Sequence, residues 1–147
     1  WETRDTDVDR NDAHKASFDG YSSLPRNLGD TLEVACGPYT QVKTILGSGH
    51  EVGSLTLLDP SAFHYMTRIQ RSSYRSGLLQ APGVDTTTVM SVTAEEMTHL
   101  TGSFDTVVII NGIEHMQDSF TALENIYRML RPGGLLVWHS RLWDVNT

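Results

Sequence analysis

Short apolar runs alternate with amphipathic stretches along most of the chain, and this alternation predicts strands that alternate with helices. The clearest buried strand is the run Phe-Asp-Thr-Val-Val-Ile-Ile-Asn at 104–111. Strands and helices that follow one another in this way predict a parallel sheet covered by helices on both faces. The five expected strands span residues 31–35, 54–58, 85–92, 104–111 and 135–139.

The stretches between these runs carry helix signals. Pro38 favours the first turn of a helix that extends to about Leu46. Ser61 is a favourable N-cap for a second helix, which extends to about Tyr74. Residues 94–100 predict a short helical turn.

A longer amphipathic helix is expected from Asp118 to Leu130, before the turn Arg131-Pro-Gly-Gly134. Its first turn could begin at Asp118, or Thr121 and Glu124 could form a capping box. The face predicted to pack on the core consists of Phe120, Leu123, Ile126, Tyr127 and Leu130.

The expected architecture is an α/β three-layer sandwich with a mainly parallel sheet of about five strands. The length of 147 residues fits one domain, which we place at 31–147 after a polar lead-in at 1–30. Sheets of this kind bind ligands outside the carboxyl ends of their strands.

Composition narrows the function. Eleven Lys and Arg against eighteen Asp and Glu give a net charge of −7, which disfavours generic binding to nucleic acid or to an anionic membrane. The single cysteine, Cys36, suits a reducing compartment, so we expect a cytoplasmic protein. No apolar run approaches the roughly 20 residues that span a bilayer.

Polar residues gather where the expected strands end. Glu33 lies near the tip of the first strand, just before a sharp turn through Gly37. Asp59, the pair Glu95-Glu96 and Asn111 follow later strands. Because parallel strands share one carboxyl edge, these side chains predict a single nucleotide-like ligand that lies across the strand tips.

Together these segments resemble the class I S-adenosylmethionine-dependent methyltransferases over roughly residues 28–140. The family's acid-hydrophobic-Gly-x-Gly-x-Gly loop reads Glu33-Val-Ala-Cys-Gly-Pro-Tyr39 here, and of its glycines only Gly37 remains. Tyr39 replaces the third glycine, where its ring could crowd, stack on or cover the methionine part of the cofactor. The segment 104–118 and the turn 131–134 match the family pattern closely.

The resemblance implies a Rossmann-like methyltransferase core with S-adenosyl-L-methionine as cofactor. It places Asp59 on the ribose, because a carboxylate can accept two hydrogen bonds from a vicinal diol. The turn Thr93-Ala-Glu-Glu96 would contact the adenine. The implied cofactor-binding residues are Glu33, Ala35, Cys36, Gly37, Tyr39, Asp59, Pro60, Ala94, Glu95 and Asn111.

His115 is the candidate catalytic base, since it follows the fourth strand where the family faces its substrate. Structural alternatives stay open for this residue and for the others. Glu33 could cap the next helix or pair with a lysine, and Asp59 could be a turn residue. Further structural alternatives are a solvated face for Glu95 and Glu96, a backbone contact for Asn111 and a filler role for Cys36.

Two other classes do not fit. A dinucleotide-binding oxidoreductase requires Gly-x-Gly-x-x-Gly after the first strand, and the chain has one glycine there. Base-modifying amino-methyltransferases carry Asn/Asp-Pro-Pro-Tyr/Phe where this chain has Asn111-Gly-Ile-Glu114. The remaining histidines show no metal-ligand spacing, so no metal site is expected.

The family sheet has two further strands beyond the fifth, and the chain stops at Thr147. We therefore expect a C-terminally incomplete domain, or a homodimer or partner that covers the edge formed by 135–139. The expected function is methyl transfer to an oxygen or nitrogen atom of a small molecule. The alternative is a non-catalytic binding or scaffold domain with an eroded cofactor loop.

Overall fold

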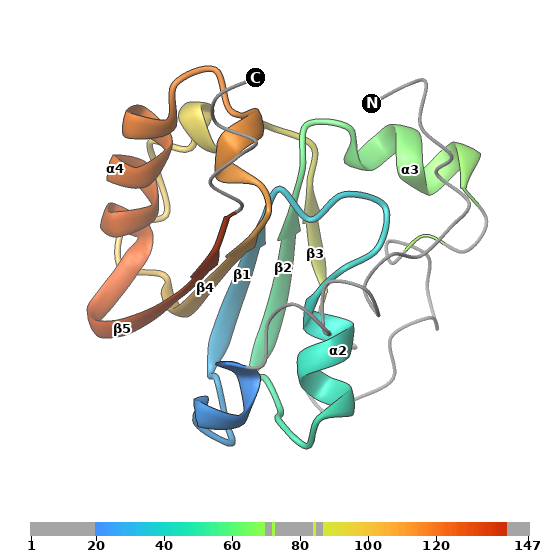
Figure 1. Cartoon of the computed structure of the whole chain (residues 1–147). Helices are drawn as coiled ribbons and strands as arrows, with labels where there is room; N and C mark the ends of the chain where they lie inside the picture. The colour runs from blue at the N-terminus through green and yellow to red at the C-terminus, as the bar shows by residue number, and fades with distance from the viewer. Residues whose placement is uncertain (1–19, 70–71, 73–83, 85–86, 141–147) are drawn as a thin grey trace.

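A computed structural model describes residues 20–69, 72, 84 and 87–140. Strands and helices alternate through these residues, as the sequence predicts (Figure 1). The elements are η1 (Gly20–Ser23), β1 (Asp30–Val34), α2 (Val42–Gly47), β2 (Ser54–Leu58), α3 (Ala62–Arg68), β3 (Thr88–Met90), η3 (Ala94–Glu96), β4 (Phe104–Ile110), η4 (Ile113–His115), α4 (Ser119–Met129) and β5 (Leu130–His139).

The five strands form one sheet in the order β3-β2-β1-β4-β5, and every neighbouring pair is parallel. Figure 1 shows α4 on one side of this sheet and α2 and α3 on the other. The three-layer fold class predicted from the sequence is confirmed. The strand order reverses at β1, so the tips of β1 and β4 meet at a switch point, where such sheets bind ligands.

Each face of the sheet has its own apolar core, because successive side chains of a strand point to opposite faces. Along β4, Val107 and Ile109 pack with α4, whereas Val108 and Ile110 pack with α2 and α3. Burial on both faces explains why this strand is apolar without interruption.

Helix α4 packs through only part of the predicted face: Ile126 is buried, and Leu123 and Leu130 pack against the core. Phe120 and Tyr127 are 83% and 80% exposed, so their assignment to the core is wrong. A helix advances about 100° per residue, which leaves both side chains roughly a quarter turn or more from Ile126. Asp118 starts the helix, since its carboxylate accepts hydrogen bonds from the Thr121 N–H and hydroxyl at 3.1 and 2.7 Å. The buried side chains of α4 are Ala122, Asn125, Ile126 and Met129.

The starts and ends of the other helices differ from the predicted ones. The first helix begins at Val42 rather than Pro38, because the loop before it bonds to the buried carboxylate of Glu33. Ser61 occupies the N-cap of α3 but its side chain makes no capping bond. The helix ends at Arg68, and Tyr74 lies outside the described residues.

The strand boundaries also shift in places. The expected strand 85–92 contains only Thr88–Met90 as a strand, and residues 85–86 lie outside the described part. The expected helical turn 94–100 is limited to 94–96. The turn 131–134 is part of β5 and forms a bulge, since Leu130 pairs with Phe104 and Leu135 with Thr106.

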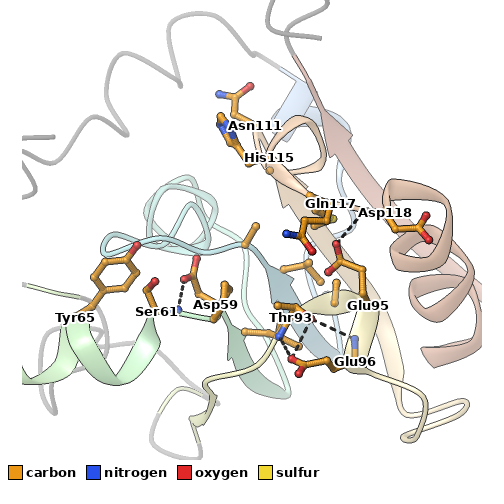
Figure 2. A pocket seen from close by; sticks show the side chains of 17 residues that line it. Asp59, Ser61, Tyr65, Thr93, Glu95, Glu96, Asn111, His115, Gln117 and Asp118 are labelled. Carbon is orange, nitrogen blue, oxygen red and sulfur yellow. Dashed lines mark hydrogen bonds between the residues drawn. The ribbon is translucent and has the colours of Figure 1, made fainter. Parts of the chain in front are cut away.

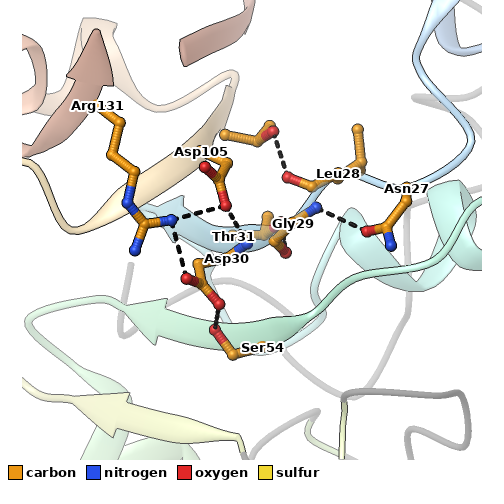
Figure 3. A network of polar contacts seen from close by, with 9 residues as sticks. Asn27, Leu28, Gly29, Asp30, Thr31, Ser54, Asp105 and Arg131 are labelled. Carbon is orange, nitrogen blue, oxygen red and sulfur yellow. Dashed lines mark hydrogen bonds and ion pairs between the residues drawn. The ribbon is translucent and has the colours of Figure 1, made fainter.

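A polar network joins four strands at the amino end of the sheet, opposite the tips (Figure 3). Arg131 Nη1 lies 2.9 Å from the Asp30 carboxylate and 2.7 Å from that of Asp105. Ser54 donates to Asp30 at 2.7 Å, and the Asp30 N–H donates to Asp105 at 2.8 Å. The Asp30 backbone bond and the Arg131 guanidinium hold the pKa of Asp105 below its ordinary value. This network links the amino ends of β1, β2, β4 and β5.

Candidate functional site

A cavity of about 620 Å³ opens at the carboxyl ends of the strands. Its walls come from the tips of β1, β2 and β4, from η3, from η4 and its following loop, and from α3 (Figure 2). The lining residues are Val34, Ala35, Leu58, Asp59, Pro60, Ser61, Tyr65, Thr93, Ala94, Glu95, Glu96, Asn111, Gly112, His115, Met116, Gln117 and Asp118.

Asp59 is the most buried charged side chain of the cavity wall, with 8% of its surface exposed. One carboxylate oxygen accepts the Gly37 N–H and the other accepts the Ser61 N–H, both at 2.9 Å. Burial raises the pKa of Asp59, and these two bonds oppose that shift. Because a carboxylate has about four acceptor positions, Asp59 can still receive two hydrogen bonds from a diol.

Glu33 does not line the cavity. Its carboxylate is fully buried and accepts hydrogen bonds from the Gln41 N–H at 2.8 Å and from the Thr40 hydroxyl. Burial raises the pKa of Glu33 to about 7. This geometry matches the alternative in which Glu33 supports the start of the next helix. Asp59 and Glu33 thus bind the same loop, Asp59 at Gly37 and Glu33 at its far end.

The structure brings together seven of the eleven predicted site residues. The four that do not line the cavity are Glu33, Cys36, Gly37 and Tyr39, which all lie in or next to the loop after β1. Their contact with a cofactor stays a prediction. The seven that line it are Ala35, Asp59, Pro60, Ala94, Glu95, Asn111 and His115.

Two residues with left-handed backbone lie side by side at the tips of β1 and β4. Ala35 has φ of 55° and Asn111 has φ of 51°. Gly112 follows so closely that a Cβ atom there would lie 2.7 Å from the Cβ of Ala35. Such conformations are costly for residues other than glycine and cluster at functional sites. Ala35 and Asn111 both line the cavity.

The turn of η3 is held rigidly against α4. Thr93 and Glu96 form a capping box, so the Glu96 carboxylate is bonded to the Thr93 N–H and hydroxyl. The buried Asn125 side chain donates to the carbonyls of Ala94 and Glu95, each at 3.0 Å. Glu95 accepts the Asp118 N–H at 3.3 Å. Both acids of the turn thus accept a backbone N–H, Glu96 within the turn and Glu95 from the start of α4.

His115 ends η4 and lines the cavity with an exposed side chain. In the view of Figure 2 it lies near the top with Asn111, while Asp59, Ser61 and Tyr65 lie at the left. The cavity volume of about 620 Å³ falls in the range of small-molecule sites. The role of His115 as a base stays a prediction.

Several lining residues were not predicted from the sequence. Tyr65 lies one helical turn after Ser61 in α3, so the spacing of four residues was an available signal. Gln117 and Asp118 lie two and three residues beyond His115; no separate role was predicted for Gln117, and Asp118 was placed at the helix start. Asn125 does not line the cavity but supports the η3 turn, and it was also not predicted, although an amide on the buried face of a helix usually has a specific hydrogen-bond partner.

The charges on the cavity wall are acidic. Asp59, Glu95, Glu96 and Asp118 contribute carboxylates, and the lining includes no lysine or arginine from the described residues. Such a wall favours a ligand that carries positive charge.

The described residues contain no group of three His, Cys, Asp or Glu side chains that could hold a metal ion. No helix there is long and apolar enough to cross a bilayer.

A sheet of this topology with a cavity at its switch point is the arrangement of class I methyltransferases, and sequence comparison agrees. The family model described as a methyltransferase domain matches residues 32–138. The chain therefore belongs to the methyltransferase domain family, which confirms the resemblance predicted from the sequence. S-adenosylmethionine is the cofactor that this membership implies. No curated protein sequence matches the chain.

Solved structures share the fold at low sequence identity. A protein from Methanococcus maripaludis, described as an S-adenosylmethionine-dependent methyltransferase, has a TM-score of 0.59 and 18% identity over 84% of this chain and 52% of that one. The N-methyltransferase NodS from Bradyrhizobium japonicum, in complex with S-adenosylhomocysteine, has a TM-score of 0.54 and 18% identity over 91% and 62%. The [4+2]-cyclase SpnF has a TM-score of 0.59 and 18% identity over 86% and 42%. The chain thus spans about half the length of these proteins.

Proposed function

We propose that the chain is the cofactor-binding core of a methyltransferase that transfers a methyl group from S-adenosylmethionine to an oxygen or nitrogen atom of a small molecule. The observation that carries this proposal is the buried Asp59 at the cavity wall, which keeps acceptor positions for a ribose diol. Family membership supports the cofactor class.

The cofactor would lie along the strand tips. Its ribose hydroxyls would donate to Asp59, and its adenine would lie between Pro60 and the turn at Ala94. Its methionine part would extend toward Ala35 and Asn111, which line the cavity at the tips of β1 and β4. The acidic wall supports this placement, because the cofactor carries a positively charged sulfonium.

The acceptor would bind beside His115, Met116 and Gln117, which line the cavity after β4. The sulfonium supplies an electrophilic methyl group, so the protein has to position the acceptor atom and exclude water. His115 would take the proton that an acceptor hydroxyl or amine loses. A wall without lysine or arginine among its described residues favours a neutral or cationic acceptor over a phosphorylated one.

Calorimetry with S-adenosylmethionine and S-adenosylhomocysteine tests the cofactor site. We expect both to bind, and Asp59→Asn to weaken binding about 10- to 100-fold, because hydrogen bonds to a charged group contribute about 1.5–3 kcal/mol. Glu124→Gln is the matched control: it makes the same carboxylate-to-amide change on the exposed surface of α4, away from the cavity. A folded wild-type sample that binds neither compound would contradict the proposal.

A second candidate is a binding or scaffold domain that has lost catalysis. It is favoured by the loop after β1, where Gly37 is the single family glycine and the Tyr39 side chain replaces another. Fold alone does not decide the reaction, since SpnF is a cyclase with a similar fold. Cofactor binding with no methyl transfer to any hydroxyl or amine acceptor would favour this candidate.

We also propose that a further strand covers β5. Among the described strands β5 pairs only with β4, and its Trp138 side chain is 47% exposed. Either a second copy of the chain or a continuation of the polypeptide would satisfy this edge. A cytoplasmic location remains part of the proposal.

A further inference from the structure

The tip of β5 is bonded twice to a residue of the cavity wall. The His139 carbonyl accepts the Asn111 N–H at 2.7 Å. The His139 ring nitrogen Nδ1 lies 3.0 Å from the amide oxygen Oδ1 of Asn111. His139 pairs with Ile110 in the sheet and does not itself line the cavity, whereas Asn111 does.

The chemistry of these two groups fixes where one hydrogen lies. An amide oxygen only accepts hydrogen bonds, so Nδ1 of His139 has to carry a hydrogen that it donates to Oδ1. The amide oxygen of Asn111 then points toward β5 and accepts a hydrogen bond from His139. Its NH₂ group, with two donors, is left for a ligand of the cavity.

The backbone adds to this constraint. Asn111 has a left-handed φ of 51°, a conformation that asparagine tolerates better than most residues. The bond between the Asn111 N–H and the His139 carbonyl anchors the residue in this conformation. The contact with the His139 ring then fixes which way the Asn111 side-chain amide points.

We propose that His139 is a positioning residue that orients the Asn111 amide so that it presents N–H donors, and not its oxygen, to the cavity. The complementary ligand group is a hydrogen-bond acceptor with negative charge, such as the carboxylate of an amino-acid moiety. This inference rests on the proposed function, because it assigns Asn111 to the amino-acid end of the cofactor.

The tautomer of His139 provides a test that needs no ligand. Long-range ¹H–¹⁵N NMR of the wild-type chain, under conditions where the spectrum itself shows a neutral His139 ring, should show a hydrogen on Nδ1. An unprotonated Nδ1 would overturn the proposal, since the Asn111 amide would then have to turn its NH₂ group toward His139.

A pair of substitutions tests the effect on binding. In His139→Asn the amide nitrogen is attached to Cγ, as Nδ1 is, so a donor is retained; His139→Leu has similar size and no donor. We expect S-adenosylhomocysteine affinity to fall about fivefold in His139→Leu and to change less than about twofold in His139→Asn. Equal affinities for the two variants would overturn the proposal.

A third variant separates positioning from a general structural effect. Asn111→Gly removes the side chain and tolerates the left-handed backbone. In this background His139→Leu should cause no further loss of affinity, and an equal loss in both backgrounds would overturn the proposal. Urea unfolding of each variant shows whether a loss of binding comes from a loss of stability.

If the wild type binds no cofactor, the proposed function fails. The tautomer measurement still shows whether His139 donates to Asn111.

Discussion

Glu33 and Asp59 are buried carboxylates that bind the loop between β1 and α2 at different points. Asp59 accepts the Gly37 N–H, and Glu33 accepts the Gln41 N–H and the Thr40 hydroxyl. Only Asp59 also faces the cavity. Both acids were predicted to contact the cofactor. In the structure only Asp59 is placed to do so from the cavity wall, whereas Glu33 contacts only protein groups.

The raised pKa of Glu33 makes stability depend on pH. Its folded-state pKa is about 7, compared with an ordinary value of 4.5, because burial disfavours the charged form. Between these values the unfolded state binds fewer protons than the folded state, so stability falls as pH rises. Relative to Glu33→Gln, we expect the wild-type free energy of unfolding to decrease by about 3 kcal/mol across this window, at about 1.4 kcal/mol per pKa unit.

Urea unfolding of both proteins at pH 4.5, 6 and 8 measures this difference. Glutamine is the matched variant, because it keeps the size of the side chain and an oxygen for the Gln41 N–H. The same pH dependence in the wild type and in Glu33→Gln would show that folding does not raise the pKa of Glu33.

The position of a single side chain could be predicted where it depends on nearby sequence. The place of Asp59 at the cavity was predictable from its position at a strand tip, since parallel strands bring their tips to one edge. The role of Glu33 depends on a contact with Thr40 and Gln41 that spacing alone does not reveal. Asn111 was predicted, but its partner His139 was not, because it lies 28 positions further along the chain.

Among the elements, the strands were predicted better than the helices. Strand β2 has the predicted bounds, and β4 differs by one residue, because burial on both faces leaves an unbroken apolar run. The start of α2 and the bulge at the start of β5 are set by contacts from other segments. The predicted face of α4 was too wide, since five apolar residues there were all assigned to the core.

Two neighbouring positions of α4 test which face packs. Ile126 is fully buried and Tyr127 is 80% exposed. We expect Ile126→Ala to lower the free energy of unfolding by about 2–5 kcal/mol, because it leaves a cavity in the core. Tyr127→Ala should change it by no more than about 0.5 kcal/mol, as an exposed substitution.

Urea or thermal unfolding of the two alanine variants is the measurement. If Tyr127→Ala proved as costly as Ile126→Ala, Tyr127 would be buried, as the sequence predicts.

In the molecule as a whole, the fold class and the edge that carries the site were predictable, and the shape of the cavity was not. Alternation of strands and helices is enough to place ligands at the carboxyl ends of a parallel sheet. The cavity wall depends on loops, and loop contacts such as those of Asn125 and Asp118 involve segments far apart in sequence. The overall charge of −7 agrees with the acidic wall but does not locate it.

The central claim is that one nucleoside ligand binds across the strand tips with its ribose on Asp59. A crystal structure of the chain with S-adenosylhomocysteine tests it most directly. We expect both ribose hydroxyls to donate to the Asp59 carboxylate, with the adenine beside Pro60 and Ala94 and the amino-acid end toward Asn111. The nucleoside bound away from Asp59, or absent from the cavity at saturating concentration, would contradict the account.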